Sequence, residues 1–297
     1  MPFDWRSYVP VILKKKYKQL KKRLFYFLMK YRTKKGVIWK TQDLINHLQL
    51  ANILEGDHIM VHASMSKIGV LEKGPFTVIN ALMQVVGSKG VILMPTSPIA
   101  CLQYDYVRSN PTFDVKNTAS AMGAISEAFR KLPNVKRSIH PTEPVAAWGV
   151  NSMDYIKDHI VKNTPYHNDS PYGKLIHNKG KILYIGVTLD NAGTHLHTLE
   201  DAIDLGLPIY ASEVFNLEVI DIDGNTIEVK TKVHNPIYSK KRKCDELLPM
   251  FLAKNVYQEV MIGDAKTLIF DAELMFNVMI DAYLTSGVTM YNPKGKE

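Results

Sequence analysis

Short apolar runs alternate with helical segments along most of the chain, and this alternation is the strongest constraint on its fold. The clearest run, residues 181–187 (KILYIGV), is near-continuously apolar and of strand length, which indicates a buried strand. Further strands are expected at 58–62, 91–94 and 145–148. Helices are expected from Thr41, with a threonine cap, and over 75–86, 120–132, 152–160 and 194–204.

The last third of the chain has a more antiparallel character. Strands at 214–221 and 226–233 are joined by Asp223 and Gly224, a dipeptide typical of hairpins. A helix near 244–254, strands at 258–262 and 267–270, and a helix over 271–285 follow. Together the elements predict a layered α/β fold with one catalytic domain over residues 36–297.

The positive charge of the chain is concentrated near its N-terminus. The net charge is +8, but residues 1–35 contain twelve Lys and Arg against one acid, so they carry +11 and the remainder carries −3. Within residues 11–32, leucines and aromatic residues recur every three or four positions, which predicts a basic amphipathic helix. Its longest apolar run, residues 24–29, is much shorter than the ~20 residues that span a bilayer.

Two interpretations of this helix remain open. It can attach the protein to the anionic inner face of the plasma membrane, where each base near the surface contributes about 1 kcal/mol. It can instead dock on the rest of the chain or on a second subunit of a homodimer. The expected location is the cytoplasm. Nucleic acid is not expected as a partner, because no nucleic-acid motif accompanies the charge and the remaining residues would repel phosphate.

The sharpest local pattern is THLHTLED, residues 194–201, which follows the strand expected at 181–187. On a helix, His197 and Glu200 share a face because they are three residues apart, and Asp201 lies on nearly the same face. A carboxylate beside an imidazole fixes its tautomer and leaves the other ring nitrogen as a general base. The spacing alone fits an ordinary surface pair as well. No metal is expected, because His195 and His197 point to different faces and no HExxH pattern is present.

Three further stretches are candidates for ligand binding. Residues 61–69 (VHASMSKIG) run from a strand into a loop whose serines, backbone N–H groups and Lys67 can hold phosphate. His140 precedes Pro141, so it is held extended and can project into a cleft. Ser170 is expected to cap a helix that begins in residues 170–175. Each of these patterns also fits a purely structural role.

Taken in order, these stretches resemble the aminoglycoside N3-acetyltransferase family. Six motifs match at the family's spacings within residues 41–205, with a looser likeness to about residue 285. They lie at residues 61–64 (VHAS), 87–95 (GSKGVILMP), 113–130 (F-D to F-R), 137–149 (R-S-x-H-P to A-A-x-G), 164–175 (T-P to K-L) and 183–200 (ending in T-x-x-H-x-x-E). The resemblance implies a three-layer α-β-α sandwich that transfers an acetyl group from acetyl-CoA to an amine on a sugar-like acceptor.

The resemblance also implies roles for individual residues. His197 matches the family's catalytic base, Glu200 the acid that orients it, and Thr194 a candidate donor to the oxyanion of the tetrahedral intermediate. CoA contacts are implied at His62, Ser64, Ser66, Lys67 and Ser170. Acceptor contacts are implied at Asp114, His140 and Asn235. No catalytic cysteine is needed, because the cofactor carries the thiol.

Two features set the chain apart from the aminoglycoside-modifying members. A stretch where some members place acids for a polycationic drug reads Val233, His234 and Asn235 here, and the basic N-terminal segment is foreign to the resistance enzymes. We therefore expect the acceptor to be an amino sugar in a sugar nucleotide or a glycan precursor of surface-polysaccharide synthesis. The alternatives are an aminoglycoside, with antibiotic resistance as the outcome, or a non-catalytic membrane-associated scaffold.

Overall fold

A seven-stranded sheet forms the centre of the computed structural model, which describes residue 36 and residues 38–296. Its middle consists of three parallel strands, β2, β1 and β6, and both flanks are antiparallel. The strands, in order across the sheet, are β4 (Lys136–Arg137), β5 (Val145–Gly149), β2 (Val91–Pro95), β1 (His58–Ala63), β6 (Lys181–Ile185), β10 (Ala265–Asp271) and β9 (Tyr257–Ile262). The apolar runs at 58–62, 91–94, 145–148 and 181–187 thus predict strands that the structure confirms.

The central strands are buried on both faces because their side chains alternate between two apolar cores. Met60 of β1 and Tyr184 of β6 pack into one core, whereas Ile59 of β1 and Ile185 of β6 pack into the other. All four side chains are completely buried. A continuous apolar run is therefore the expected sequence for β6, since neither of its faces meets water.

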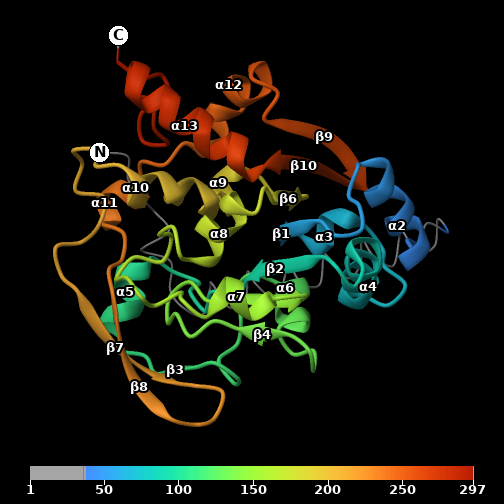
Figure 1. Cartoon of the computed structure of the whole chain (residues 1–297), viewed down its shortest axis with the longest axis horizontal. Helices are drawn as coiled ribbons and strands as arrows, with labels where there is room; N and C mark the ends of the chain where they lie inside the picture. Colours follow the sequence, from blue (N-terminus) through green and yellow to red (C-terminus); the bar gives the residue numbers. More distant parts are fainter. Residues whose placement is uncertain (1–35, 37, 297) are drawn as a thin grey trace, which may run out of the picture.

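Helices cover both faces of this sheet and complete the expected α-β-α sandwich (Figure 1). One core is closed by α2 (Thr41–Leu50), α4 (Pro75–Val86) and α6 (Ala124–Phe129). The other is closed by α7 (Ser152–Ile156), α8 (Pro171–His177), α9 (Leu189–Ala192), α10 (Thr198–Ala202), α12 (Leu248–Ala253) and α13 (Ala272–Ser286). The short elements α3 (Met65–Ile68), α5 (Gln103–Arg108), α11 (Pro236–Ser239), η2 (Thr194–His197) and η3 (Cys244–Leu247) lie in the connections.

A second, three-stranded sheet lies beside the main one and consists of β3 (Phe113–Asp114), β7 (Phe215–Ile220) and β8 (Thr226–Thr231) (Figure 1). The hairpin expected at Asp223 and Gly224 joins β7 to β8, and Gly224 adopts φ +88°, a conformation that favours glycine. The chain that leaves β8 then returns toward the main sheet, where His234 bridges to Tyr210. This return positions a side chain of the candidate site.

Several helix boundaries differ from the sequence prediction. The helix expected over 120–132 begins only at Ala124, because Gly123 adopts φ +113° and the Glu127 side chain reaches back to accept from the Ser120 N–H. The helix at 41–50 has Lys40 rather than Thr41 as its N-cap. The main-chain N–H of Lys40 donates to the Asp43 carboxylate over 2.8 Å. The helix expected over 152–160 ends at Ile156.

The helix expected over 194–204 is a 3-10 turn, η2, followed by the short helix α10. The Thr198 hydroxyl donates to the His195 carbonyl over 2.7 Å at this junction. The region 244–254 divides in the same way into η3 and α12. The basic helix expected within residues 1–35 lies outside the described residues. Within the described part of the chain, no helix combines the length and apolarity that crossing a bilayer requires.

Candidate active site

His197 and Glu200 form the centre of the candidate site, on the segment that follows β6 and α9. His197 ends η2 and Glu200 lies in the first turn of α10, so the three-residue spacing brings the two side chains together. Nδ1 of His197 lies 2.9 Å from Oε2 of Glu200, and the Glu200 side chain has no exposed surface. The structure thus contains the histidine–carboxylate pair that the spacing predicts.

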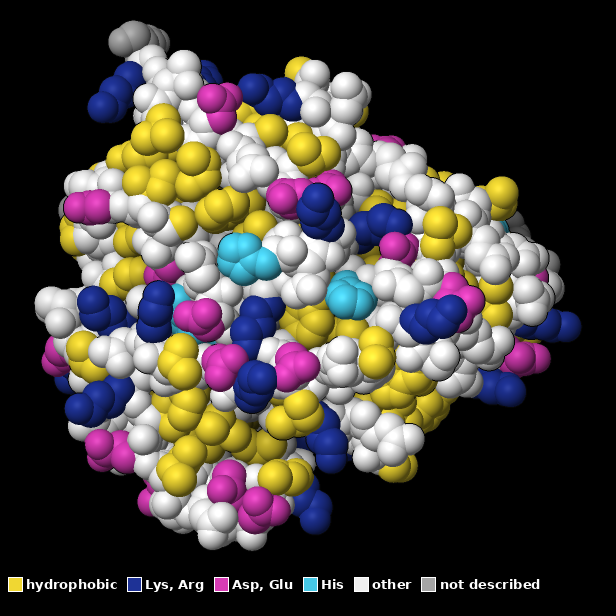
Figure 2. All heavy atoms as spheres, viewed as in Figure 1, with side chains coloured by type: hydrophobic (Ala, Val, Ile, Leu, Met, Phe, Trp, Pro, Cys, Tyr) yellow, Lys and Arg dark blue, Asp and Glu magenta, His cyan; other side chains and the backbone are white. Residues whose placement is uncertain are grey.

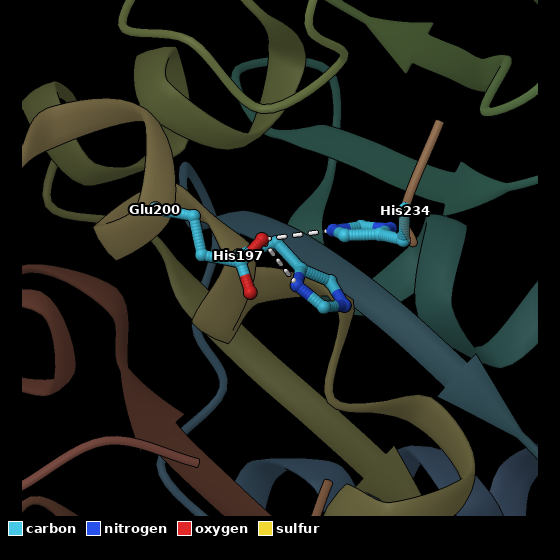
Figure 3. Close-up of side chains that lie close together, drawn as sticks. All are labelled: His197, Glu200 and His234. Carbon is cyan, nitrogen blue, oxygen red and sulfur yellow. Dashed lines mark hydrogen bonds and ion pairs between the residues drawn. The ribbon is translucent and has the colours of Figure 1, made fainter. Parts of the chain in front are cut away.

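A second histidine binds the same carboxylate oxygen. Nε2 of His234, from the segment after β8, lies 2.8 Å from Oε2 of Glu200, and Figure 3 shows both imidazoles directed at this one atom. The other carboxylate oxygen accepts from the Tyr291 hydroxyl. The ring centroids of His197 and His234 lie 4.3 Å apart, and the centroid of the Tyr166 ring lies 4.8 Å from that of His197. The orientation of the His197 ring is therefore fixed by one hydrogen bond and two ring contacts.

Burial and charge act in opposite directions on these groups. Burial lowers the pKa of His197 to about 3, and the Glu200 carboxylate acts against this shift. Burial raises the pKa of Glu200, but the two neighbouring imidazoles outweigh it and hold that pKa well below its usual range. At neutral pH His197 is therefore neutral and Glu200 ionised. Nδ1 of His197 donates to Glu200, and no group in the described part of the chain binds its Nε2, so this nitrogen can accept a proton.

His197, Glu200 and His234 are also the one set of ligand-type side chains that converges within residues 38–296, their atoms lying within 4.8 Å of one another. The two N···O separations are 2.8 and 2.9 Å. Two ligands on a tetrahedral zinc at ~2.0–2.1 Å would lie about 3.3 Å apart. The geometry is that of a hydrogen-bonded group with protons between its members.

The residues expected on the CoA side gather where β1 and β6 end. Thr194 Oγ1 lies 3.4 Å from Nε2 of His62, and Ser64 and Ser66 exchange a hydrogen bond of 3.2 Å at the start of α3. Gly186 allows the two loops to approach, since a Cβ there would meet the Cβ of Lys67 at 2.5 Å. Adjacent carboxyl ends of parallel strands are the usual ligand sites of such sheets. A cavity of about 100 Å³ lies at this edge, lined by His62, Thr194, Met94, Met122, Ser126 and Asn191 among others.

Four other residues named from the sequence are already engaged in structural contacts. Ser170 caps α8 as expected, accepting from the Gly173 N–H over 3.2 Å, and is completely buried. His140 is also completely buried, with the Glu143 N–H directed at its Nδ1 over 3.2 Å. Asp114 accepts from two backbone N–H groups in the turn after β3, and Asn235 caps α11. Their ligand contacts stay predictions, and burial weakens the case for Ser170 and His140.

A larger cavity of about 520 Å³ borders the carboxylate side of the site. Its lining includes Glu200, Asp201, Asp204 and Tyr210, with Lys232 as a basic residue. Asp201 does not bind His197, although the helical spacing puts it on nearly the same face. Its carboxylate accepts from the Tyr210 hydroxyl over 2.9 Å and from the Tyr166 N–H over 3.2 Å, and burial raises its pKa to about 6. Because the Glu200 carboxylate is buried and already bound, Asp201 and Asp204 are the acids that this cavity offers against Lys232, and they make it suited to an amine.

Sequence reasoning missed five residues around Glu200. They are Gln103, Glu143, His234, Arg242 and Tyr291, and they come from segments far apart in the chain. His234 was noted only as part of an acid-poor stretch, and no local spacing connects it with Glu200, 34 residues earlier. Contacts of this kind are created by packing, so a single sequence carries no short-range signal for them.

Comparison with known proteins identifies a family. The model of the aminoglycoside 3-N-acetyltransferase family matches residues 60–283. Aminoglycoside N(3)-acetyltransferase IV from Salmonella sp is 30% identical over 187 residues, which cover 62% of this chain and 68% of that protein.

Solved structures agree with this match. A complex of AAC-IIIb with CoASH has a TM-score of 0.70 at 24% identity and covers 84% of this chain and 98% of that one. AAC-VIa bound to sisomicin has a TM-score of 0.70 at 25% identity and covers 82% of this chain and 97% of that one. These alignments cover 82–84% of this chain, so most of its fold is shared with the two solved structures.

Proposed function

Because the chain belongs to the aminoglycoside 3-N-acetyltransferase family and is thus an N-acetyltransferase, we propose that His197 is the general base for transfer of the acetyl group of acetyl-CoA to an amine of an amino sugar. The observation that carries this proposal is the buried His197–Glu200 hydrogen bond, 2.9 Å long, with Nε2 of His197 left without a partner among the residues that the structure describes. A neutral imidazole with one nitrogen held by a carboxylate is suited to remove a proton from an attacking amine.

The reaction requires one proton to move twice. Nε2 of His197 takes a proton from the amine as its nitrogen attacks the thioester carbon, and Glu200 keeps the ring aligned through Nδ1. The C–N bond forms, the C–S bond of the tetrahedral intermediate breaks, and the leaving thiolate of CoA recovers the proton from the imidazolium. The products are the acetamide and free CoA, and His197 is neutral again.

Thr194 and the β1 loop form the proposed cofactor side. The Thr194 hydroxyl lies three residues before His197 and is the candidate donor to the developing oxyanion. His62, Ser64, Ser66 and Lys67 surround the end of β1, where hydroxyls and an ammonium can hold the pantetheine and phosphate groups. A relative of this fold binds CoASH.

Two acceptor classes are candidates. An aminoglycoside is favoured by the names of the relatives, by the sisomicin complex of AAC-VIa and by the acidic lining of the 520 Å³ cavity. An amino-sugar nucleotide or glycan precursor is favoured by His234 and Asn235, because a stretch expected to hold acids for a polycation carries an imidazole and an amide. On the face drawn in Figure 2, basic and acidic side chains are interspersed, and no extended patch of one sign selects between the two.

Thiol release from acetyl-CoA tests the function and separates the acceptors. The protein is assayed side by side with aminoglycosides of the gentamicin and sisomicin type and with amino-sugar nucleotides. Turnover with the aminoglycosides alone excludes the nucleotide acceptor, and turnover with the nucleotides alone excludes the aminoglycoside. CoA binding by calorimetry without turnover on any amine would favour the non-catalytic scaffold.

We further propose that residues 1–35, which lie outside the described residues, attach the protein to an anionic membrane surface. The support is their charge of +11 beside recurring leucines and aromatic residues. Sedimentation with anionic vesicles should depend on these residues and weaken with salt. Binding that is unchanged by truncation or by salt contradicts the proposal.

A further inference from the structure

A continuous chain of hydrogen bonds leads from Glu200 away from the proposed base. Nε2 of His234 meets Oε2 of Glu200, and Nδ1 of His234 lies 3.1 Å from Oε1 of Gln103. The amide nitrogen of Gln103 donates in turn to Glu143. His234 is 2% exposed and Glu143 7%, so water does not substitute for these partners. The chain connects α10, the segment after β8, α5 and the loop before β5.

The orientation of the Gln103 amide determines where His234 carries protons. Its Oε1 accepts from the main-chain N–H of His234 over 3.2 Å, and a main-chain N–H can only donate. Turning the amide over would direct its NH₂ group at that N–H and its oxygen at the Glu143 carboxylate. The oxygen therefore faces His234, and Nδ1 of His234 must carry a proton to bind it.

The opposite ring nitrogen also faces an acceptor. Oε2 of Glu200 already accepts from His197, and its partner oxygen accepts from Tyr291, which is the pattern of an ionised carboxylate surrounded by donors. We propose that Gln103 and Glu143 hold His234 with both ring nitrogens protonated, so that an imidazolium is the counter-ion of Glu200. His234 and Gln103 are then positioning residues, and neither is required to touch a substrate.

The groups around His234 act in both directions. Burial has the largest effect and, with the Arg242 guanidinium, lowers the pKa of His234 below its ordinary value, whereas Glu200 raises it. The case for the imidazolium therefore rests on the two acceptors that face its ring nitrogens, and the Glu143 carboxylate supports it through the Gln103 dipole. The His234 ring is stacked on the Tyr210 ring, with the two centroids 5.0 Å apart, and it packs against Tyr166 and His197. Burial raises the pKa of Glu143 to about 7, so this support increases as the pH rises through neutrality.

The catalytic consequence rests on the proposed function, in which His197 is the base. The negative charge of Glu200 would stabilise a His197 imidazolium, but a positive His234 offsets that charge. His197 therefore stays neutral and ready to accept a proton. Loss of the His234 charge raises the pKa of His197 by about 1–3 units, the usual effect of one charge within 4–6 Å. The acidic limb of kcat/KM then moves to higher pH by the same amount.

Ring ¹⁵N NMR of the histidine-labelled full-length protein at pH 7 tests the proton count directly. The His234 signals are assigned by their loss in His234→Gln. The expected result is two protonated nitrogens in the wild type and one in Gln103→Met. A neutral His234 in the wild type overturns the proposal whether or not the protein acetylates amines, so this readout is independent of the proposed function.

The pH dependence of kcat/KM, with one acceptor and saturating acetyl-CoA, tests the consequence. Gln103→Met is expected to shift the acidic limb to higher pH. The matched control is Gln42→Met at an exposed position, which removes only a hydrogen bond to Asn46 and should leave the limb where it is. A uniform loss of rate with an unshifted limb would mean that Gln103 is merely structural. If Gln103→Met does not fold by circular dichroism, His234→Gln decides, because it removes the same charge and should give the same shift.

Discussion

Two histidines of η2, His195 and His197, are both buried but have opposite surroundings. His197 is bonded to a carboxylate, whereas neither ring nitrogen of His195 has a hydrogen-bond partner in the described part of the chain. Burial lowers the pKa of each ring to about 3. Burial therefore makes both rings neutral, but only His197 has a group that orients it and can stabilise a proton taken from a substrate.

The difference follows from the direction of the two side chains. Residues two apart on a helical turn point to different sides, so His197 meets the segment after β8, while His195 packs beside Met275 and Met279 of α13. The centroid of the Tyr172 ring lies 6.1 Å from that of the His195 ring. A turn that begins at a sheet edge thus places one histidine in a polar network and its neighbour in an apolar core.

The largest effect is expected from His197→Ala. Removing a general base typically costs 10²–10⁴-fold in rate, so kcat should fall by about that factor. Circular dichroism and CoA affinity should stay near wild type, because in the described part of the chain the ring is hydrogen-bonded to Glu200 and not to the proposed CoA loop. A variant that keeps most of its turnover, measured by thiol release, would show that another group is the base.

Glu200→Ala should have the next largest effect, on stability as well as on rate. His197, His234 and Tyr291 would lose their common acceptor, and breaking a buried ion pair from one side costs about 3–5 kcal/mol. Urea unfolding at pH 7 measures the loss. The matched control is Glu246→Ala, whose exposed pair with Lys243 is worth at most about 1 kcal/mol. Equal losses in the two variants would contradict a buried ionic centre.

The sequence predicts those parts of the site that depend on local spacing. The strand expected at 181–187 is recognisable because it is near-continuously apolar, and the His197–Glu200 pair because the two residues are three apart on a helical segment. His234 and Tyr291 reach the same carboxylate, and Gln103 reaches His234, only through the packing of β8, the C-terminal segment and α5. The start of α6 differs from the prediction for a similar reason, since its boundary depends on a positive φ at Gly123.

His195→Phe should preserve function and leave stability unchanged or improved. Two buried ring nitrogens without partners each carry a desolvation cost of about 1–3 kcal/mol, and a phenyl ring of similar shape carries none. Thiol release within a few-fold of wild type and an equal or higher melting temperature are the expected results. A hundredfold loss of rate in a folded variant would place His195 in the catalytic machinery and remove the contrast with His197.

The effect that is smallest near neutral pH is a change in how stability depends on pH. The folded pKa of His195, about 3, lies below the ~6.5 of an unfolded histidine, so between these values the unfolded chain binds more protons. Acidification from pH 6.5 therefore destabilises the wild type through this residue by about 1.4 kcal/mol per pH unit, and nothing is lost above pH 6.5. In His195→Phe this contribution is absent. Urea unfolding at pH 7, 6, 5 and 4 should show the variant's advantage growing as the pH falls, whereas a constant difference would mean that the folded and unfolded states bind protons equally at His195.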